Sequence, residues 1–262
     1  MEITALKNSQ VKMACALKQK KYREKERKFL AEGLRTVEEA VKSGAVVSVF
    51  YTDAENARLE ACLGKAATCG AKLYRVSEGV FKKIADTETP QGIVAVCRIP
   101  EYSLEDLFGS SRLLLALDRI ADPGNLGTIL RTADAAGAAG VALFAGCTDL
   151  YAPKTVRASM GSVFHIPAIA GVTEEEFFKA AHKWGYKVVV TCLRGAENLY
   201  TAELAGRLVL VMGSESTGVS ENILKTADTK LYIPMPGAAE SLNVAVATGI
   251  FMFELLRRNL NA

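Results

Sequence analysis

Two polar residues, Ser241 and Asn243, stand at the start of the most apolar stretch of the chain. They follow the Pro/Gly loop PMPGAAE, and from Leu242 to Leu256 the sequence predicts a helix that is apolar on nearly every side. Such a helix is normally buried, so polar side chains in its first turn need partners. The preceding loop is rich in free backbone N–H groups. We therefore expect a ligand to bind where this loop meets the helix.

Three loops in the second half of the chain share one design. They lie within residues 118–137, 208–220 and 231–259, and each follows a strand-like run, carries glycine and leads into a helix. The carboxyl ends of parallel strands are where α/β proteins bind ligands. Glycine permits close approach of the backbone, and helix N-termini favour negative charge. The pattern predicts a binding site at this edge of a parallel sheet.

The common cofactor, metal and nucleophile motifs are missing from these loops. The sequence has no GxGxxG, and GSESTGVS lacks the lysine of a Walker A loop. No His, Asp and Glu cluster has metal-ligand spacing, and no Ser or Cys sits in a nucleophile elbow. We interpret His165 and His182 as structural. These observations argue against an ordinary dehydrogenase, a P-loop enzyme and a metal centre.

Alternating strands and helices are expected to position the loops. This order is typical of an α/β protein with a largely parallel sheet, and we expect it in both halves of the chain. Residues 101–111 are acidic and polar and end in Gly-Ser-Ser, which is typical of a linker. The sequence thus predicts two domains, residues 1–100 and 112–262. The expected helices cover residues 3–20, 34–42, 57–69, 78–85, 126–136, 153–160, 174–184, 220–226 and 242–256, and the expected strands 46–51, 72–76, 92–98, 112–120, 140–144, 163–166, 187–192, 207–212 and 231–233.

The composition is that of a globular protein, with 50% apolar and 23% charged residues. The six cysteines form no CxxC pair, which favours a reducing cytoplasm over a disulfide framework or zinc site. No apolar run reaches the ~18 residues of a membrane span, and the first residues lack a signal-peptide core. We expect a cytoplasmic protein without a membrane segment.

Positive charge is concentrated at the N-terminus. Residues 1–35 hold ten Lys/Arg and four Glu, a net charge of +6, while the other 227 residues sum to −3. A basic block on a near-neutral body indicates a phosphate-binding surface, hence nucleic acid. The alternative interpretation is a solvated helix face. The candidate RNA contacts are Lys20, Lys21, Arg23, Lys25, Arg27, Lys28 and Arg35.

Three segments of the second half resemble a known family. NLGTILRTADAAG, GSESTGVS and IPMPGAAESLNVAVATGI are similar, in order and spacing, to the signature motifs of the SpoU (TrmH-like) RNA ribose 2′-O-methyltransferases of the SPOUT superfamily. RKFLAEGLRTVEEAV and ETPQGIVAV resemble the ribosomal-protein-like RNA-binding domain that many members carry. The resemblance covers essentially the whole chain.

The resemblance implies a fold, a cofactor and partners. The implied fold is a smaller N-terminal α/β RNA-binding domain followed by a catalytic α/β domain with a deep trefoil knot, which is rare among proteins. The implied cofactor is S-adenosylmethionine, bound in the knot, and the implied assembly is a homodimer. Ribosomal RNA is the favoured substrate over tRNA. A catalytically inactive RNA-binding module and a small-molecule α/β enzyme, such as a nucleotide-sugar transferase, are the alternatives.

The resemblance also implies roles for individual residues. We interpret Arg131 as a clamp on an RNA phosphate, because a guanidinium rarely gives up its proton to act as a base. Alternatives remain for three positions: Asn125 and Ser241 as helix N-caps, and Arg131 as an ion-pair partner of Glu215. The second motif has Ser214 where Asn is common, and the third has Ala245 where Ser is common. The implied catalytic residues are Asn125, Arg131, Glu215, Ser241 and Asn243, and the implied cofactor contacts are Met212, Gly213, Ile233, Met235 and Leu242.

Overall fold

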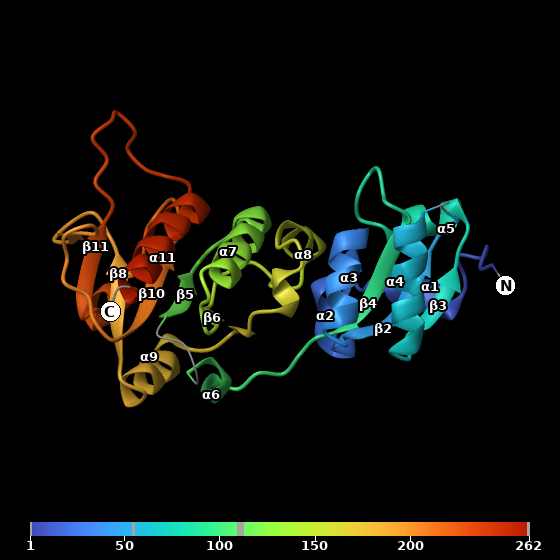
Figure 1. Cartoon of the computed structure of the whole chain (residues 1–262), viewed down its shortest axis with the longest axis horizontal. Helices are drawn as coiled ribbons and strands as arrows, with labels where there is room; N and C mark the ends of the chain where they lie inside the picture. The colour runs from blue at the N-terminus through green and yellow to red at the C-terminus, as the bar shows by residue number, and fades with distance from the viewer. Residues whose placement is uncertain (1, 54–55, 109–112, 261–262) are drawn as a thin grey trace. The chain divides into compact units, whose positions relative to one another are not determined.

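A computed structural model of the chain describes residues 2–53, 56–108 and 113–260 (Figure 1). The chain divides into two compact units. Unit 1 comprises residues 1–101 and 149–165, and unit 2 comprises residues 102–148 and 166–262. None of the described helices is long and apolar enough to cross a membrane.

Unit 1 is built on a four-stranded mixed sheet with the order β1-β4-β2-β3. Only β2 and β3 run parallel, since β4 pairs antiparallel with both β1 and β2. The prediction of a largely parallel sheet is therefore wrong for this unit, because β4 enters between two strands that run opposite to it. The apolar run at Phe29, which carried no strand prediction, forms β1. The strands are β1 (Lys28–Glu32), β2 (Val46–Tyr51), β3 (Lys72–Arg75) and β4 (Ile93–Arg98).

Helices cover both faces of this sheet. Buried side chains of α3, α4 and α8 share one hydrophobic cluster with the sheet, and those of α1 and α5 share another. The helix predicted over residues 3–20 is shorter, because α1 ends at Ala16 and a new helix begins at Lys20. The helices are α1 (Ser9–Ala16), α2 (Lys20–Glu26), α3 (Leu34–Lys42), α4 (Ala57–Thr68), α5 (Glu78–Ile84) and α8 (Pro153–Ala158).

The segment 149–165 packs with unit 1, although it lies in the range predicted for the second domain. Its aromatic rings contact Phe29 of β1, with centroids 4.7 Å away at Tyr151 and 5.6 Å at Phe164. Its buried Val156 and Val163 join the same cluster. A strand was predicted at 163–166, but residues 162–164 form a 3₁₀ turn. The segment buries its apolar side chains by covering one face of the unit 1 sheet.

Unit 2 contains a seven-stranded sheet with the order β7-β6-β5-β10-β8-β11-β9. All of its paired strands run parallel, which confirms the predicted α/β class. The backbone knot implied by the family stays a prediction. The strands are β5 (Leu113–Asp118), β6 (Val141–Leu143), β7 (Ala168–Ala170), β8 (Tyr186–Thr191), β9 (Glu197–Asn198), β10 (Arg207–Gly213) and β11 (Thr229–Tyr232).

The helices of unit 2 lie in two groups. Those named α6, α9 and α10 share one hydrophobic cluster with the strands, whereas α7 and α11 pack against each other (Figure 1). Leu107 and Phe108, within the predicted linker, are fully buried in this unit, and Gly109, Ser110 and Ser111 lie outside the described residues. The helices are α6 (Leu104–Leu107), α7 (Pro123–Ala135), α9 (Glu174–Lys183), α10 (Glu221–Thr226) and α11 (Val244–Leu260).

Candidate active site

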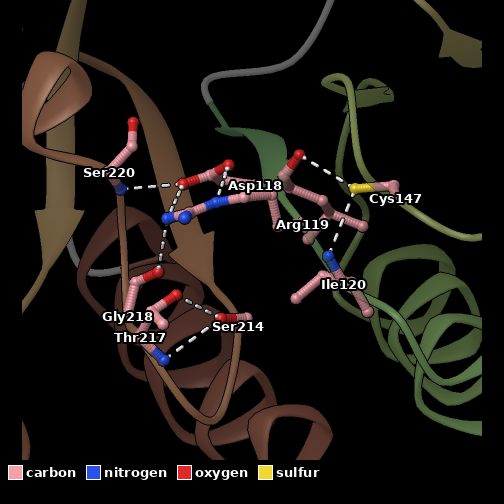
Figure 2. A network of polar contacts seen from close by, with 9 residues as sticks. Asp118, Arg119, Ile120, Cys147, Ser214, Thr217, Gly218 and Ser220 are labelled. Carbon is pink, nitrogen blue, oxygen red and sulfur yellow. Dashed lines mark hydrogen bonds and ion pairs between the residues drawn. The ribbon is translucent and has the colours of Figure 1, made fainter.

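The three glycine-containing loops follow β5, β10 and β11 at one edge of the unit 2 sheet. The strands β5 and β10 end side by side, because Asp118 and Gly213 are register partners in a parallel pair. After Gly213 the chain folds back on itself through a bridge between Ser214 and Gly218. The Ser214 hydroxyl lies 2.8 Å from the Thr217 hydroxyl and accepts the Thr217 N–H at 3.3 Å (Figure 2). This tight turn carries Glu215.

One side chain from each loop joins a hydrogen-bonded series, here called the amide chain: Glu215, Asn125 and Asn243. The Asn125 amide donates to Glu215 Oε1, and the Asn243 amide donates to Asn125 Oδ1 at 3.0 Å. A carboxylate can only accept, so it fixes which way the Asn125 amide faces. The amide chain therefore joins the loop of Asn125 to two loops that lie 90 and 118 residues further along the sequence.

The caps of the two site helices differ from the alternatives left open by the sequence. Asp122 caps α7 by accepting the Asn125 N–H at 2.8 Å, so the interpretation of Asn125 as the N-cap is wrong. Helix α11 begins at Val244, not at Ser241. Its cap is Asn243, whose Oδ1 accepts the backbone N–H groups of Ala245 at 3.0 Å and Val246 at 3.3 Å. The interpretation of Ser241 as the N-cap of α11 is therefore wrong.

Arg131 lies on the exposed face of α7, opposite the buried Leu130 and Ala133. The alternative interpretation of Arg131 as an ion-pair partner of Glu215 is wrong, since Glu215 accepts from Asn125 instead. Among the described residues Arg131 has no hydrogen bond or ion pair. A guanidinium with all its donors available suits an anionic group from outside the chain.

A cavity of about 450 Å³ opens between the loops after β8, β10 and β11. Its lining includes Glu215 and Ser241 but not Asn125, Arg131 or Asn243. The size, and apolar walls with a few polar groups, are typical of a small-molecule site. All five predicted cofactor contacts line it: Met212, Gly213, Ile233, Met235 and Leu242.

One wall of this cavity was not predicted from the sequence. Thr191, the last residue of β8, and residues 192–194, which directly follow it, line the cavity, so the rule that strand ends bind ligands applied to them as well. Glu240 also lines it and adds a second carboxylate to that of Glu215. With Arg194, the charged lining residues are two carboxylates and one guanidinium, and this net negative charge favours a positively charged ligand group. Burial raises the pKa of the Cys192 thiol in this wall, which opposes a role as a thiolate nucleophile.

The two histidines lie away from the cavity. His165 contacts Glu39 at 3.1 Å in unit 1, and His182 lies 3.6 Å from Asp228 in unit 2. Both contacts fit structural roles. Within the part of the chain that the structure describes, no group of three or more His, Cys, Asp or Glu could hold a metal ion.

The predicted RNA-binding residues fall into two groups. Most are exposed or half-buried on unit 1: Lys20, Lys21, Lys25, Arg27, Lys28 and Arg35. Arg23 is the exception, with a side chain only 5% exposed that pairs with Asp149. It also donates to the carbonyls of Leu17 and Lys18 at 2.8 and 2.7 Å, just after α1 ends. The prediction of RNA contact is wrong for Arg23, because its donors are used inside the fold.

This arrangement makes Arg23 important for stability. Arg23→Ala leaves a partly buried carboxylate and two carbonyls without their donor, so we expect unfolding free energy to fall by about 3 kcal/mol. Urea denaturation followed by circular dichroism measures the change. The exposed Lys25→Ala is the matched control and should shift the midpoint very little; equal shifts would contradict the assignment.

Comparison with known proteins places the chain in a family. The SpoU rRNA Methylase family matches residues 112–253, and the MRM3-like substrate binding domain matches residues 8–95. The chain belongs to the SpoU rRNA methylase family. The family prediction, including its N-terminal substrate-binding domain, is confirmed.

Relatives of known name support the same assignment. The 23S rRNA (guanosine(2553)-2′-O)-methyltransferase RlmP of Bacillus subtilis is 39% identical over 254 residues, which are 97% of this chain and 98% of the relative. The AdoMet-bound rRNA methyltransferase of Sinorhizobium meliloti has a TM-score of 0.89 at 39% identity, covering 99% and 98% of the two chains. AviRb of Streptomyces viridochromogenes, solved with AdoMet, has a TM-score of 0.87 at 27% identity, covering 97% and 100%. AdoMet is S-adenosylmethionine, so the predicted cofactor is confirmed.

Proposed function

We propose that this SpoU-family protein methylates a ribose 2′-hydroxyl of ribosomal RNA, using S-adenosylmethionine. The observation that carries the proposal is the amide chain beside the cavity, which unites all three family motifs at one sheet edge. The relatives named as 23S rRNA 2′-O-methyltransferases support ribosomal RNA as the substrate. A ribosomal RNA substrate implies that the protein acts in the cytoplasm.

Different residues bind the cofactor, orient the ribose and bind the RNA phosphate. S-adenosylmethionine, when bound, supplies a methyl group that its sulfonium already activates. The loop after β10 and the stretch from Ile233 to Leu242 hold the cofactor and keep water from it. Ser241 and the amide chain orient the ribose. Arg131 binds the neighbouring phosphate and stabilises negative charge that develops on the 2′-oxygen, whose proton leaves to phosphate or water.

The test is direct methylation of unmodified 23S rRNA by the full chain with radiolabelled S-adenosylmethionine. A 2′-O-methyl group blocks alkaline cleavage at its nucleotide, so hydrolysis maps the product. We expect label at a ribose of rRNA and little in tRNA, and an Asn125→Ala variant that binds cofactor but transfers slowly. A chain that binds RNA but not cofactor in calorimetry would instead be an inactive binding module.

The exposed basic residues of unit 1 are proposed to bind the RNA. Lys20→Gln with Lys21→Gln should weaken RNA binding and reduce the slope of log affinity against log salt by about two, one per phosphate contact. Filter binding at several salt concentrations measures this, and cofactor affinity should not change. Deletion of residues 1–100 is a poorer test, because it would expose the apolar side chains of residues 149–165. An unchanged slope would contradict the assignment.

A homodimer is proposed from the outer face of α11. Val246 is 53% exposed and Phe253 48% exposed, and Ile250 lies between them, so apolar side chains recur at i, i+4 and i+7 on one face. Such a seam is typical of a helix that packs against another helix. Phe253→Asp should convert a dimer to a monomer in sedimentation, while Lys187→Asp, on an exposed strand position, should not. A wild-type monomer at micromolar concentration would disprove the dimer.

A further inference from the structure

A salt bridge at the end of β5 closes the loop that carries Glu215 (Figure 2). Asp118 is buried, with 1% of its surface exposed, and its carboxylate accepts two bonds from Arg119, each 3.0 Å long. The same carboxylate accepts the Ser220 N–H at 2.8 Å. Arg119 also donates to the Gly218 carbonyl at 3.2 Å. The Arg119 guanidinium therefore connects the end of β5 to Gly218, where the loop after β10 folds back.

The backbone is strained to make this contact. Arg119 has a φ of +57°, a left-handed conformation that residues with a Cβ rarely adopt. Gly146 lies against its stem, and a Cβ at that position would be 2.8 Å from Arg119 Cγ. Glycine would fit position 119 more easily, yet the chain has arginine there. A strained backbone conformation of this kind is found mostly at functional sites, where the contacts of the side chain keep it in place.

We propose that Arg119 is a positioning residue for methyl transfer. It fixes residues 214–220, of which residues 214–219 line the cofactor cavity, and the loop presents Glu215 to Asn125. A loop held only by its own turn would sample orientations in which the amide chain is broken. This inference rests on the proposed function of the site.

The test is Arg119→Gly in the full chain. Glycine relieves the positive φ but leaves the buried Asp118 carboxylate without its cation, so circular dichroism first checks that the variant is folded at the assay temperature. We expect cofactor affinity to fall about tenfold and the single-turnover methylation rate to fall about 10–100-fold, with RNA affinity unchanged. Met160→Gly is the matched control, because Met160 has a φ of +53° in unit 1 and its relief should change neither quantity. Arg119→Lys keeps the charge but not the planar fork and should restore only part of the loss.

A double-mutant cycle separates positioning from general stability. If Arg119 acts through Glu215, Arg119→Gly should cost much less rate in a Glu215→Gln background than in the wild type. Full additivity, or wild-type affinity and rate in Arg119→Gly, would overturn the inference. If the wild type binds cofactor but methylates no RNA, the proposed function fails, while the affinity measurements still test Arg119.

A second, independent feature lies in unit 1, where a cavity of about 400 Å³ opens beside α1 and α5. Its apolar walls include Val11, Ala16 and the 36% exposed ring of Tyr22. Two exposed lysines, Lys12 and Lys83, also line it. Apolar walls, one aromatic ring and two cations match the faces of a nucleobase and the phosphates on either side of it.

We infer that this cavity takes an unpaired nucleobase of the RNA. The exposed Lys20 and Lys21 directly precede Tyr22, so the backbone of the same RNA strand would follow them. The base would stack on Tyr22, and Lys12 and Lys83 would contact the flanking phosphates. This inference rests on RNA as the substrate and adds a docking position outside the methylation site.

The test is binding of a short single-stranded RNA that carries 2-aminopurine, a fluorescent base, to the full chain. Tyr22→Ala should weaken binding about tenfold and abolish fluorescence quenching, with an unchanged salt slope. Lys12→Gln should instead reduce the slope by about one. Tyr200→Ala, which removes an exposed ring of unit 2, is the control. Wild-type quenching in Tyr22→Ala would overturn the inference, whereas no RNA binding by the wild type would count against the proposed function.

Discussion

Arg131→Ala is expected to lower the single-turnover rate of methyl transfer about 10²–10³-fold while leaving cofactor affinity unchanged. The side chain is exposed on α7, outside the cavity, and makes no bond within the described residues, so its loss costs neither packing nor cofactor contact. What is lost is a charge-assisted contact with the RNA phosphate beside the reacting ribose. Rapid-quench assays with saturating RNA measure the rate, and calorimetry measures cofactor binding. Lys187→Ala, exposed on β8, is the charge-matched control.

Arg131→Lys distinguishes a phosphate clamp from a base. A lysine retains the positive charge but loses the planar fork, so a clamp predicts a partial rate with the wild-type pH profile. A base predicts a near-normal rate with a new and lower apparent pKa, because an ammonium releases its proton more easily than a guanidinium. The second outcome would disprove the clamp. Single-turnover rates measured across pH for wild type and variant therefore separate the two mechanisms.

The sequence predicted the cofactor cavity better than the polar contacts beside it. Strand, glycine and helix follow one another in local sequence, and one rule places all such loops at one sheet edge. The resemblance to the family then implied Gly213 and Leu242 as cofactor contacts, and both line the cavity. The amide chain was harder, because Asn125 and Asn243 are 118 residues apart. Their types indicated a site, but only the folded chain shows that they bond to each other.

Helix starts and side-chain faces were the weakest local predictions. An apolar run that begins at Leu242 does not show which residue makes the first helical bond, and Asn243 competes with Ser241 for the cap. Arg131 follows the apolar Ile129 and Leu130, which suggested that it needs a partner such as Glu215. Each residue turns about 100° around a helix, however, and this turn brings Arg131 to the exposed face.

Other errors came from contacts between distant segments. Arg23 looks like its lysine neighbours in sequence, but Asp149, 126 residues away, makes it structural. The same distant segment completes unit 1 by packing on Phe29. Strand direction in unit 1 is equally nonlocal, because alternation of strand and helix does not show that β4 enters between β1 and β2.

Gly213→Ala is expected to be as damaging to cofactor binding as Arg131→Ala is to the rate. Gly213 ends β10, and the loop returns so closely over it that an added Cβ would overlap the backbone of Gly218 and Val219. Backbone atoms cannot rotate away as a side chain can, so the loop must shift, and with it Glu215 and one wall of the cavity. We expect cofactor affinity to fall about 100-fold, measured by calorimetry.

The neighbouring loop offers a matched control for this substitution. Gly237 lies between β11 and α11 but, unlike Ile233, Met235 and Leu242 of the same stretch, does not line the cavity. A Cβ there would meet nothing within 4 Å, so Gly237→Ala adds the same methyl group without displacing the chain. It should retain cofactor affinity within about twofold. Equal affinity in both variants would mean that the loop after β10 does not shape the cofactor site. We expect cofactor affinity to fall most in Gly213→Ala, less in Arg119→Gly and hardly at all in Gly237→Ala. This order would mean that the close backbone return at Gly213 holds Glu215 in place more strongly than the salt bridge of Arg119 does.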